Sequence, residues 1–575
     1  MSAVGSYYSD RNLLLFAFLM LALAVLVVAM KPRLSDVDQD RFFMVVISCV
    51  SLSLLLSTTL LSDNLVGWDI HQEYAIFSQV LRNGVWHPTI DLPYNSVLSV
   101  SLLPAILSVV SGLDGLLIFR IVFPLLFSTV PLFLYKLYRQ FLNPRAAFLS
   151  AFLFMSYPTF YVELPALARQ QIAEIFLVLV LWFVFSRKVR QEQSTSFVVL
   201  ALTAGLITAH YSIAFLYIFI LALSFLLFKF VLRRDASLLY VTKPAMIAMT
   251  ASITIVWYAF VTSGSDLTHL TLTLLGVSLG AVKDFLNPSS RPLIVSQALG
   301  YYVHPGLLHD LNRATNYVAN VLLILGFFVF AFKRQKTRSE EMMLPIITSG
   351  LVLLGASVLL PYLAGALNFT RVYHIALLFV APCFFYGCAS TYSSVKKVYA
   401  YLGGVRLPSV HMRFSGRWAL AAFIIVSYLL FNSGWVWAVS MDLPTSYTFD
   451  GQRILSSRIA DYYNYFDAPE DVASARWLRP QLTNGSSLCS DFLSRSHIMN
   501  AYGGIPVGDP SFYTRTFPYC DFKTTNIFYF GVLNTRYGIG TSEDPNNFTW
   551  PASAVYSELG IRDRAYSNGG TVIYA

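Results

Sequence analysis

Long apolar runs recur along the chain from residue 12 to residue 438, and they constrain its fold more than any other feature. A run of about 20 apolar residues is long enough to cross the hydrocarbon core of a bilayer as an α-helix. Only 12% of the 575 residues are charged, against about 25% in a typical soluble domain. The pattern therefore predicts an α-helical polytopic membrane protein with about 12 transmembrane helices. The predicted spans lie near residues 12–30, 42–61, 116–135, 146–162, 172–186, 195–209, 211–228, 241–262, 315–332, 342–363, 371–391 and 418–438.

Basic residues gather in the short loops between these runs, and loops of this kind face the cytoplasm. The rule places the N-terminus, the loops 62–115 and 263–314 and the tail 439–575 outside the cell. The net charge of +9 is then a matter of membrane orientation, and we expect no nucleic-acid partner. Residues 97–111 are apolar but too short to cross without breaking the alternation, so we expect a re-entrant or interfacial helix there. The basic residues are Lys31, Arg33, Arg41, Lys136, Arg139, Arg145, Arg187, Lys188, Arg190, Lys229, Arg233, Arg234, Lys333, Arg334, Lys336, Arg338, Lys396, Lys397, Arg406, Arg413 and Arg417.

The tail differs in composition from the rest of the chain. We expect residues 1–438 to form the transmembrane module and residues 439–575 to form an extracytoplasmic soluble α/β domain, with a helix near 470–479 and short strands such as TVIYA. Cys489 and Cys520 lie in this tail, where a disulfide and two buried thiols are equally compatible with the sequence. Three N-x-[ST] sequons fall on the predicted outer side, and they are headed by Asn368, Asn484 and Asn547.

The stretch GWDIHQEY, residues 67–74, lies in the first outer loop. Apolar side chains at helical spacing over residues 70–83, followed by Gly84, predict an amphipathic helix on the outer surface. Asp69 then stands at the N-cap position, and Gln72 three residues later completes a capping box. Asp69 therefore has a structural interpretation as a helix cap.

The same stretch also has a chemical interpretation. Glu73 lies four residues after Asp69, so the two carboxylates share one face of the predicted helix. Paired carboxylates suit proton abstraction and the binding of a divalent cation. Asp69 or Glu73 is therefore a candidate general base, and the pair is a candidate Mg²⁺ or Mn²⁺ site. His71 points to another side of the helix, where we expect it to be solvated.

These motifs resemble those of known membrane proteins. An acidic motif in the first outer loop, followed by surface helices, resembles the GT-C superfamily of membrane glycosyltransferases. GWDIHQEY together with ARQQIAEIF, residues 168–176, also resembles an archaeal family of predicted membrane proteins that has no assigned function. The GT-C resemblance covers about residues 42–438, and it implies a sugar donor linked to polyprenyl phosphate, here dolichyl phosphate. The WWDYG motif of oligosaccharyltransferases is absent, which argues against transfer of a whole glycan to asparagine.

The resemblance implies roles for residues of the second outer loop. GT-C enzymes hold an arginine and an acid there, and Arg169 and Glu174 match best. Glu163 and Gln170 are neighbouring candidates at the outer mouth. Glu174 is also a candidate cation ligand together with the acidic pair of the first loop. The alternative for Arg169 is a side chain that merely extends to the membrane interface.

A second basic candidate lies late in the bundle, in NFTRVYH at residues 368–374. In the resembling enzymes a basic group at this place holds the carrier phosphate, which implies Arg371 with Tyr373 and His374 beside it. Arginine suits the task because its fork donates two charge-assisted hydrogen bonds to phosphate. The alternative is interfacial anchoring. His210 is a candidate substrate contact, although a structural histidine is the better interpretation.

The sequence therefore predicts an inverting glycosyltransferase in the cell membrane. It would move a sugar from polyprenyl (dolichyl) phosphate to a hydroxyl of a glycan, lipid or protein acceptor at the outer face. Asp69 would accept the proton, Arg371 would stabilise the departing phosphate, and Glu73 would orient the acceptor or a cation. Two alternatives stay open, a lipid or polysaccharide transporter and a non-catalytic membrane assembly protein. Carboxylates confined to the outer mouth favour the enzyme, whereas charges spread through the bilayer depth favour transport.

Overall fold

The computed structural model describes residues 21, 36–186 except 93, 194–233, 243–298 except 286, 305–401, 416–440, 442, 459–505 except 484, 513–556 except 518 and 545–547, 559 and 562–575. Several predicted features lie outside the described residues. They are the span 12–30 apart from residue 21, the basic residues Lys31, Arg33, Arg187, Lys188, Arg190, Arg234, Arg406 and Arg413, and the sequons at Asn484 and Asn547.

The chain is a multi-pass membrane protein built from apolar helices. In the described part, seven helices are long and apolar enough to cross a membrane, or eight if one pair bent by 58° is a single span. Every predicted span on described residues overlaps a helix. Three of the predicted spans form helices of 16 or 17 residues, α11 (Ser194–Ala209), α13 (Pro244–Phe260) and α20 (Gly416–Asn432). The candidate spans are α3 (Asp36–Thr59), Gly115–Tyr138 with α8 (Val130–Tyr138), the bent pair α9 (Pro144–Met155) and Thr159–Ala166, α10 (Ala168–Phe185), α12 (Tyr211–Leu226) continued to Val231, α16 (Leu307–Ala331), α17 (Arg338–Leu359) and α19 (Phe369–Tyr401).

Helix α19 runs through the centre of the bundle and packs against α16, α17, α9 and α20. Glycines let α16 and α19 approach closely. A Cβ atom at Gly326 would collide with the backbone of Cys383, and a Cβ atom at Gly387 would collide with the backbone of Leu322. Small residues at such crossings allow the backbone contact on which helix association in a membrane depends.

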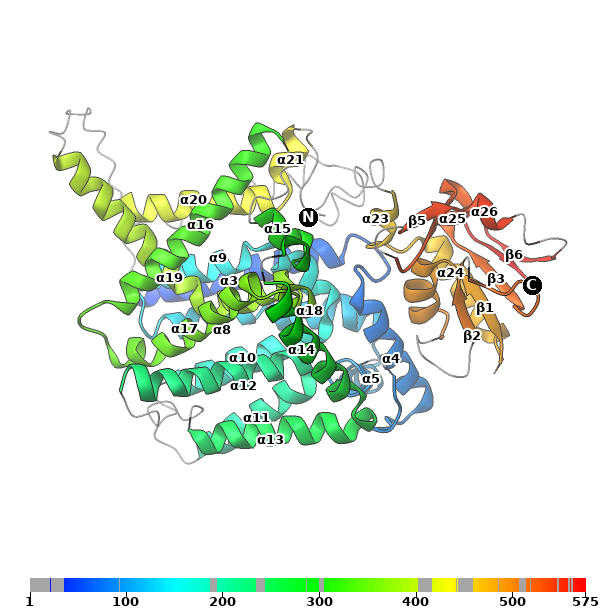
Figure 1. The fold of residues 1–575 in the computed structure, drawn as a ribbon, viewed down its shortest axis with the longest axis horizontal. Helices are drawn as coiled ribbons and strands as arrows, with labels where there is room; N and C mark the ends of the chain where they lie inside the picture. The colour runs from blue at the N-terminus through cyan, green and yellow to red at the C-terminus, as the bar shows by residue number, and fades with distance from the viewer. Residues whose placement is uncertain are drawn as a thin grey trace.

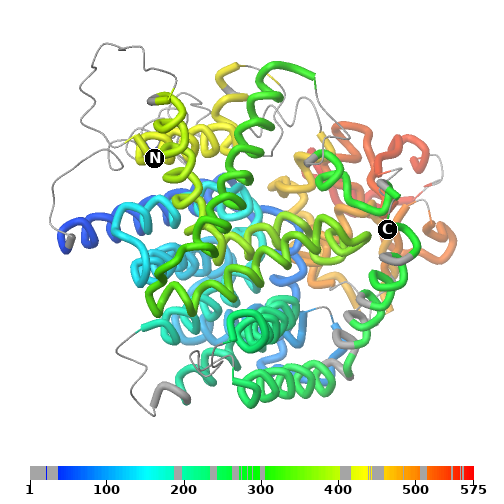
Figure 2. The backbone as a smooth tube through the Cα atoms, turned by 60° about the vertical axis from the view of Figure 1, so that its left-hand side comes forward, coloured from blue at the N-terminus to red at the C-terminus, as the bar shows by residue number. Residues whose placement is uncertain are grey.

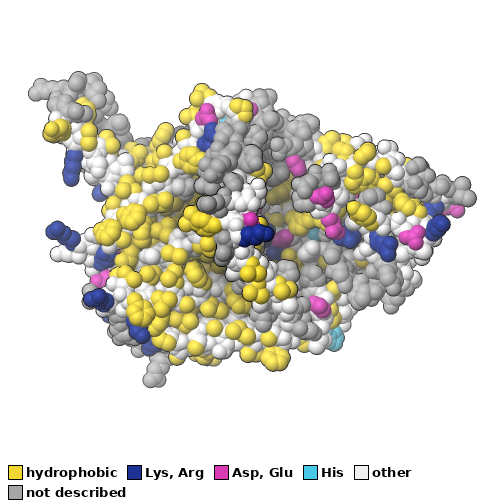
Figure 3. All heavy atoms as spheres, viewed as in Figure 1, with side chains coloured by type: hydrophobic (Ala, Val, Ile, Leu, Met, Phe, Trp, Pro, Cys, Tyr) yellow, Lys and Arg dark blue, Asp and Glu magenta, His cyan; other side chains and the backbone are white. Residues whose placement is uncertain are grey.

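The two ends of the bundle differ in charge. Hydrophobic side chains cover much of the face seen in Figure 3, and Lys and Arg side chains gather at the end farthest from the C-terminal domain. The connection between α16 and α17 and the last turns of α19 lie at this same end (Figure 1). The predicted basic loops among the described residues therefore share one end of the molecule, as the alternation of spans requires.

The tail forms an α/β domain beside the bundle (Figures 1 and 2). Its five-stranded sheet has the order β2-β1-β3-β7-β6, in which β1 is parallel to β2 and β3, and β7 is antiparallel to β3 and β6. The predicted helix near 470–479 is α24 (Pro469–Leu478), and TVIYA contains β7 (Val572–Tyr574). Cys489 and Cys520 form a disulfide. The other elements are β1 (Ser487–Ser490), η11 (Ser494–Met499), β2 (Tyr513–Thr516), β3 (Ile527–Phe530), α25 (Val532–Tyr537), β4 (Ile539–Thr541), β5 (Thr549–Pro551) and β6 (Arg564–Ser567).

Helix α4 (Asp69–Asn83) carries the motif of the first outer loop, and it lies between the bundle and this domain (Figure 1). It ends at Gly84, which adopts a φ of 67°, as predicted. The apolar side chains Ile70 and Phe77 are buried. The segment before the helix joins the domain, since Gly67 N donates to Tyr465 O at 2.9 Å. The predicted surface helix is therefore covered, because the tail packs against it.

The short segment 97–111 forms a helix, α5 (Leu102–Ser111), that is too short to cross a bilayer. The remaining described α-helices are α6 (Gly115–Leu117), α7 (Phe123–Phe127), α14 (Ser265–Lys283), α15 (Leu293–Ala298), α18 (Leu363–Leu367), α21 (Trp435–Ser440), α23 (Ile459–Tyr463) and α26 (Ser553–Tyr556).

Candidate active site at the mouth of the bundle

Four charged side chains meet where α4, α10 and α19 come together. Arg169 Nη2 donates to Asp69 Oδ2 at 2.8 Å, and Arg371 Nη2 donates to the same oxygen at 2.9 Å. Arg169 Nη1 donates to Glu73 Oε1. The second oxygen of Glu73 accepts from the backbone N–H of Ala168 at 2.8 Å. The structure thus brings together the acid pair of the first outer loop, the arginine of the second and the late arginine of the bundle.

The spacing along α4 explains this geometry. Residues four apart lie one above the other on a helix, so Asp69 and Glu73 present two carboxylates to one guanidinium fork. Arg169 is also covered from one side, because its guanidinium lies 4.1 Å from the centre of the Tyr94 ring. Tyr94 holds this place with a φ of 65°, which is uncommon for a residue other than glycine. Arg169 is therefore fixed in place and only 3% exposed, which contradicts a side chain that merely extends to the interface.

The two carboxylates have different electrostatic surroundings. Burial raises the pKa of Glu73 to about 7, because the attraction of Arg169 does not offset burial and the nearby charge of Asp69. Burial acts in the same direction on Asp69, but the guanidinium groups of Arg169 and Arg371 outweigh it and hold the pKa of Asp69 below its usual value. Glu73 is fully buried, whereas 15% of the Asp69 side chain is exposed. Of the two acids, Asp69 is therefore the one with exposed surface.

The predicted capping role of Asp69 is wrong. The N-cap of α4 is Trp68, and no side chain caps this end of the helix. Asp69 is the first residue of the helix, and its carboxylate turns instead to the two arginines. Two cationic partners from distant spans bind the carboxylate more strongly than a neighbouring backbone N–H does, and the sequence around residue 69 contains no sign of them.

Glu174 and His374 form a second buried pair, one turn deeper in the bundle. His374 Nε2 lies 3.3 Å from Glu174 Oε2, and Gln170 Nε2 donates to Glu174 Oε1 at 2.9 Å. The His374 ring packs at 4.4 Å from the ring of Phe154. His374 is thus part of the core behind the mouth. Gln170 and Glu174 belong to the same polar contact.

The other predicted mouth residues have supporting contacts. Glu163 Oε2 accepts from Thr370 Oγ1 at 2.7 Å, which ties the second outer loop to the residue before Arg371. Tyr373 Oη donates to Asn320 Oδ1 on α16 at 2.6 Å. His210 Nδ1 accepts from Ser212 N at 3.2 Å and caps α12, which gives this histidine a structural role.

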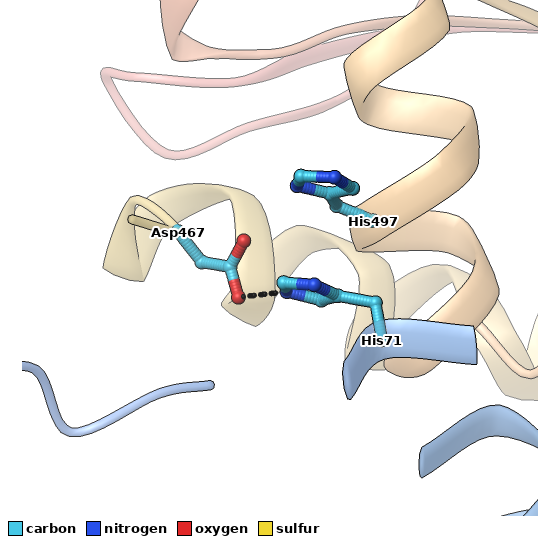
Figure 4. A group of neighbouring side chains, drawn as sticks. All are labelled: His71, Asp467 and His497. Atoms are coloured by element: carbon cyan, nitrogen blue, oxygen red, sulfur yellow. Dashed lines mark hydrogen bonds and ion pairs between the residues drawn. The ribbon is translucent and has the colours of Figure 1, made fainter. Parts of the chain in front are cut away.

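The predicted cation ligands do not gather around one point. Among the residues that the structure describes, one group of three metal-binding side chains lies close enough to hold an ion, and it consists of His71, Asp467 and His497 (Figure 4). His71 is fully buried, so its predicted exposure to solvent is wrong, because the tail covers that side of α4. The sequence offered no signal for Asp467 or His497, since neither has metal-ligand spacing to any neighbour.

Solved structures with a similar helix arrangement include several membrane glycosyltransferases. The oligosaccharyltransferase from Archaeoglobus fulgidus in the apo form aligns with 93% of this chain and 74% of its own length, at 12% identity and a TM-score of 0.49. ArnT from Cupriavidus metallidurans, bound to undecaprenyl phosphate, aligns over 94% and 97% of the two chains, at 13% identity and a TM-score of 0.44. Arabinofuranosyltransferase AftD from Mycobacteria aligns over 93% and 40%, at 13% identity and a TM-score of 0.42. At such values the function has to be argued from the site itself.

A comparison with curated proteins finds no match. The sequence model of a family described as predicted membrane protein (DUF2206) matches residues 170–574, which include Glu174, Arg371, Asp467 and His497. This agrees with the resemblance to predicted membrane proteins that the motifs indicate. The match covers more than half of the chain, and the chain therefore belongs to the DUF2206 family of predicted membrane proteins.

Proposed function

We propose that this protein is an inverting glycosyltransferase that uses a sugar linked to polyprenyl phosphate, dolichyl phosphate in an archaeon, and transfers the sugar to an acceptor hydroxyl at the outer face of the cell membrane. The observation that carries the proposal is the partly exposed carboxylate of Asp69, held between Arg169 and Arg371 at the mouth of an apolar bundle. A base and an anion-binding cation side by side, next to lipid, are what transfer from a lipid phosphate requires.

Arg371 is the proposed ligand of the carrier phosphate. Its side chain is 25% exposed, and its Nη2 atom donates to Asp69. Its Nε atom is buried and has no hydrogen-bond partner among the described residues. One edge of the guanidinium therefore retains donors for a phosphate oxygen, and two such bonds would hold the leaving group in line. Arg169 also has a buried Nε atom without a partner among the described residues, but its side chain is only 3% exposed and both of its Nη atoms donate to carboxylates, so it is closed to a phosphate.

Asp69 is the proposed general base. In the transfer step the acceptor oxygen forms a bond to the anomeric carbon while the bond from that carbon to the phosphate oxygen breaks. The electron pair of the broken bond stays on the phosphate, beside Arg371, and the hydroxyl proton passes to Asp69. Glu73 is too deeply buried to touch a substrate, so we assign it a positioning role through Arg169. The acceptor is a glycan, a lipid or a protein.

A Mg²⁺ or Mn²⁺ ion does not fit the acid pair as the structure arranges it. Asp69 Oδ2 accepts from two guanidinium groups, and both oxygens of Glu73 are hydrogen-bonded. A divalent cation placed there would face two fixed positive charges at close range. The arginines already supply the charge that a cation would contribute, so the proposed step uses no metal ion.

The orientation of the chain supports this assignment. A disulfide in the tail is typical of an oxidising, extracytoplasmic compartment. The mouth of the bundle lies on the same side as the tail, and the basic loops gather at the opposite end (Figures 1 and 3). We therefore place the active site and the C-terminal domain outside the cell.

One observation favours a transporter for a lipid or a polysaccharide as the second candidate. The buried pair of Glu174 and His374 is charged or polar at a place where most side chains are apolar, and intramembrane ionisable residues often mark a transport path. Both residues, however, lie within about 9 Å of the outer ends of their helices at 1.5 Å per residue. Ionisable groups confined to the mouth favour the enzyme.

The deciding experiment is a transfer assay with the purified chain. Polyprenyl phosphate carrying a radiolabelled sugar serves as donor, and cell-envelope extract serves as acceptor. Label that moves into an acid-stable product supports the transferase. The transporter becomes the better assignment if no label leaves the lipid while the same lipid crosses the bilayer of vesicles that contain the protein.

A further inference from the structure

Two histidines and an aspartate meet at the junction of the outer loop and the C-terminal domain. His71 lies on α4, His497 on η11 and Asp467 just before α24. One donor atom of each lies within 4.8 Å of the others. The imidazole rings of His71 and His497 lie face to face at 4.3 Å, with the carboxylate of Asp467 beside them (Figure 4). His71, His497 and Asp467 are 0%, 2% and 6% exposed, so the group is a closed internal site.

A neutral His71 ring beside an ionised Asp467 cannot donate a hydrogen bond in both of its polar contacts, because a neutral imidazole carries one N–H. His71 Nδ1 faces the carbonyl oxygen of Trp68 at 3.2 Å, and a carbonyl oxygen only accepts. His71 Nε2 faces Asp467 Oδ2 at 2.8 Å, and this oxygen already accepts from Tyr502 Oη at 2.7 Å. Both ring nitrogens therefore face acceptors. The contacts need an additional positive species at Nε2, either a second proton or a metal ion.

The surroundings of His497 favour the metal ion over the second proton. Its Nε2 atom is buried and has no hydrogen-bond partner among the described residues. An unpartnered buried nitrogen is costly in an apo site, and coordination of a cation removes that cost.

We propose that His71, His497 and Asp467 bind a zinc ion that fastens the C-terminal domain to the outer-loop helix α4. Two imidazole nitrogens and one carboxylate oxygen are a donor set that zinc favours, whereas magnesium and calcium prefer oxygen alone. Tetrahedral zinc places its donors about 3.3 Å apart, so small rotations of the three side chains bring their donor atoms to this spacing, and a water molecule would be the fourth ligand. The contacts of His71 to the Trp68 carbonyl and of Asp467 to Tyr502 are the outer hydrogen bonds that orient metal ligands.

The placement of this site gives it a mechanical role. One ligand comes from the helix that carries Asp69, and the other two come from the tail. Zinc would therefore join two parts of the chain that are almost 400 residues apart in sequence, since His71 and Asp467 are separated by 396 positions. The inference does not depend on the proposed function, because it concerns metal content and the docking of the domain.

The test begins with the full chain purified without a polyhistidine tag, in detergent. After incubation with zinc chloride and gel filtration, we expect about one zinc per chain by mass spectrometry of the metal, and a fall of about tenfold or more in H71Q and in H497Q. Asp467→Asn, which keeps the shape of the side chain, should also lose zinc. The matched control is His87→Gln, an exposed histidine of the same outer loop, which should retain it. Replacement of zinc by cobalt gives an independent test, because Co²⁺ in a tetrahedral site absorbs visible light.

Docking is measured by hydrogen exchange before and after treatment with a chelator. We expect faster exchange in α4 and η11 after the metal is removed, and no change in the strands β1 and β3. The metal site is overturned if the wild type binds no zinc, or if H71Q and H497Q bind as much as the wild type. The fastening role is overturned if zinc leaves and exchange in α4 does not change.

Discussion

Replacing Asp69 with Asn separates the chemical role of this residue from its structural one. Asn keeps the size of the side chain and one oxygen that accepts from a guanidinium, but it cannot take up a proton at neutral pH. Loss of a general base costs about 10²–10⁴-fold in kcat, or about 3–5 kcal/mol in the activation barrier. The same change also weakens the ion pairs to Arg169 and Arg371. Complete loss of one charge-assisted hydrogen bond would cost about 1.5–3 kcal/mol, and the oxygen that Asn retains reduces this cost.

Glu73→Gln is the matched control for this loss of charge. It makes the same carboxylate-to-amide change four residues further along α4, against the same Arg169. Both variants weaken a pair with Arg169, but D69N also weakens the pair with Arg371, so we expect the larger loss in thermal stability in D69N. Glu73 does not reach the substrate, so E73Q should lose less than about tenfold in kcat. The gap in kcat between D69N and E73Q measures the loss of the base together with the weakened pair to Arg371.

The assay is transfer of a radiolabelled sugar from polyprenyl phosphate by the purified wild type, D69N and E73Q, with thermal unfolding recorded for each. The reasoning fails if D69N turns over like the wild type. It also fails if E73Q is as slow as D69N while both fold normally, since the shared loss would then lie in the positioning of Arg169.

Three further predictions follow from the same contacts. Arg371→Ala should raise the KM for the lipid donor by about tenfold or more, because a charge-assisted pair with phosphate is lost, whereas Arg371→Lys should recover part of the lost affinity. An equal KM in both variants and the wild type would remove Arg371 from the donor site. Single cysteines in residues 469–478 should react with an impermeant thiol reagent in intact cells and those in residues 333–338 should not, and the reverse result inverts the orientation. Burial raises the pKa of Asp471 to about 7 in the folded chain, so its contribution to stability is fully present below about pH 4 and is lost by up to about 4 kcal/mol as the pH rises to 7. Thermal unfolding across this range should show the loss in the wild type and a flatter profile in Asp471→Asn, and equal pH profiles would contradict it.

The sequence predicted the elements better than their contacts. Apolar length located the helices on the described residues, because crossing a bilayer imposes a length that can be read directly. Asp69 and Arg371 were chosen as candidate site residues from local motifs and resemblance. Their mutual contact did not, because 302 positions separate them and no local pattern encodes such a distance.

The errors concern burial, and they have one physical cause. Gly84 and the apolar positions of α4 predicted an amphipathic helix correctly, but the sequence did not indicate that its polar side would be covered. His71 was therefore expected in solvent, and Asp69 was expected to cap the helix. The tail, which begins about 370 residues later, supplies the cover. Which surface a domain packs against is decided by shape and tertiary contacts, and a periodic pattern reports only that a face is polar.

The length of helix α19 between Arg371 and Lys396 determines how deep Arg371 can lie in the membrane. The rod is unbroken from Phe369 to Tyr401, and 25 residues separate Arg371 from Lys396, which corresponds to about 38 Å at 1.5 Å per residue. This length exceeds the roughly 30 Å of hydrocarbon, so both cationic side chains sit in the headgroup layers when the helix stands near the membrane normal. Lys396 and Lys397, held in the opposite headgroup layer, therefore keep Arg371, the proposed phosphate ligand, from moving deeper into the bilayer. Adding one residue to the middle of this helix would raise Arg371 by about 1.5 Å and turn it by about 100°, out of reach of Asp69, with every residue of the site still present.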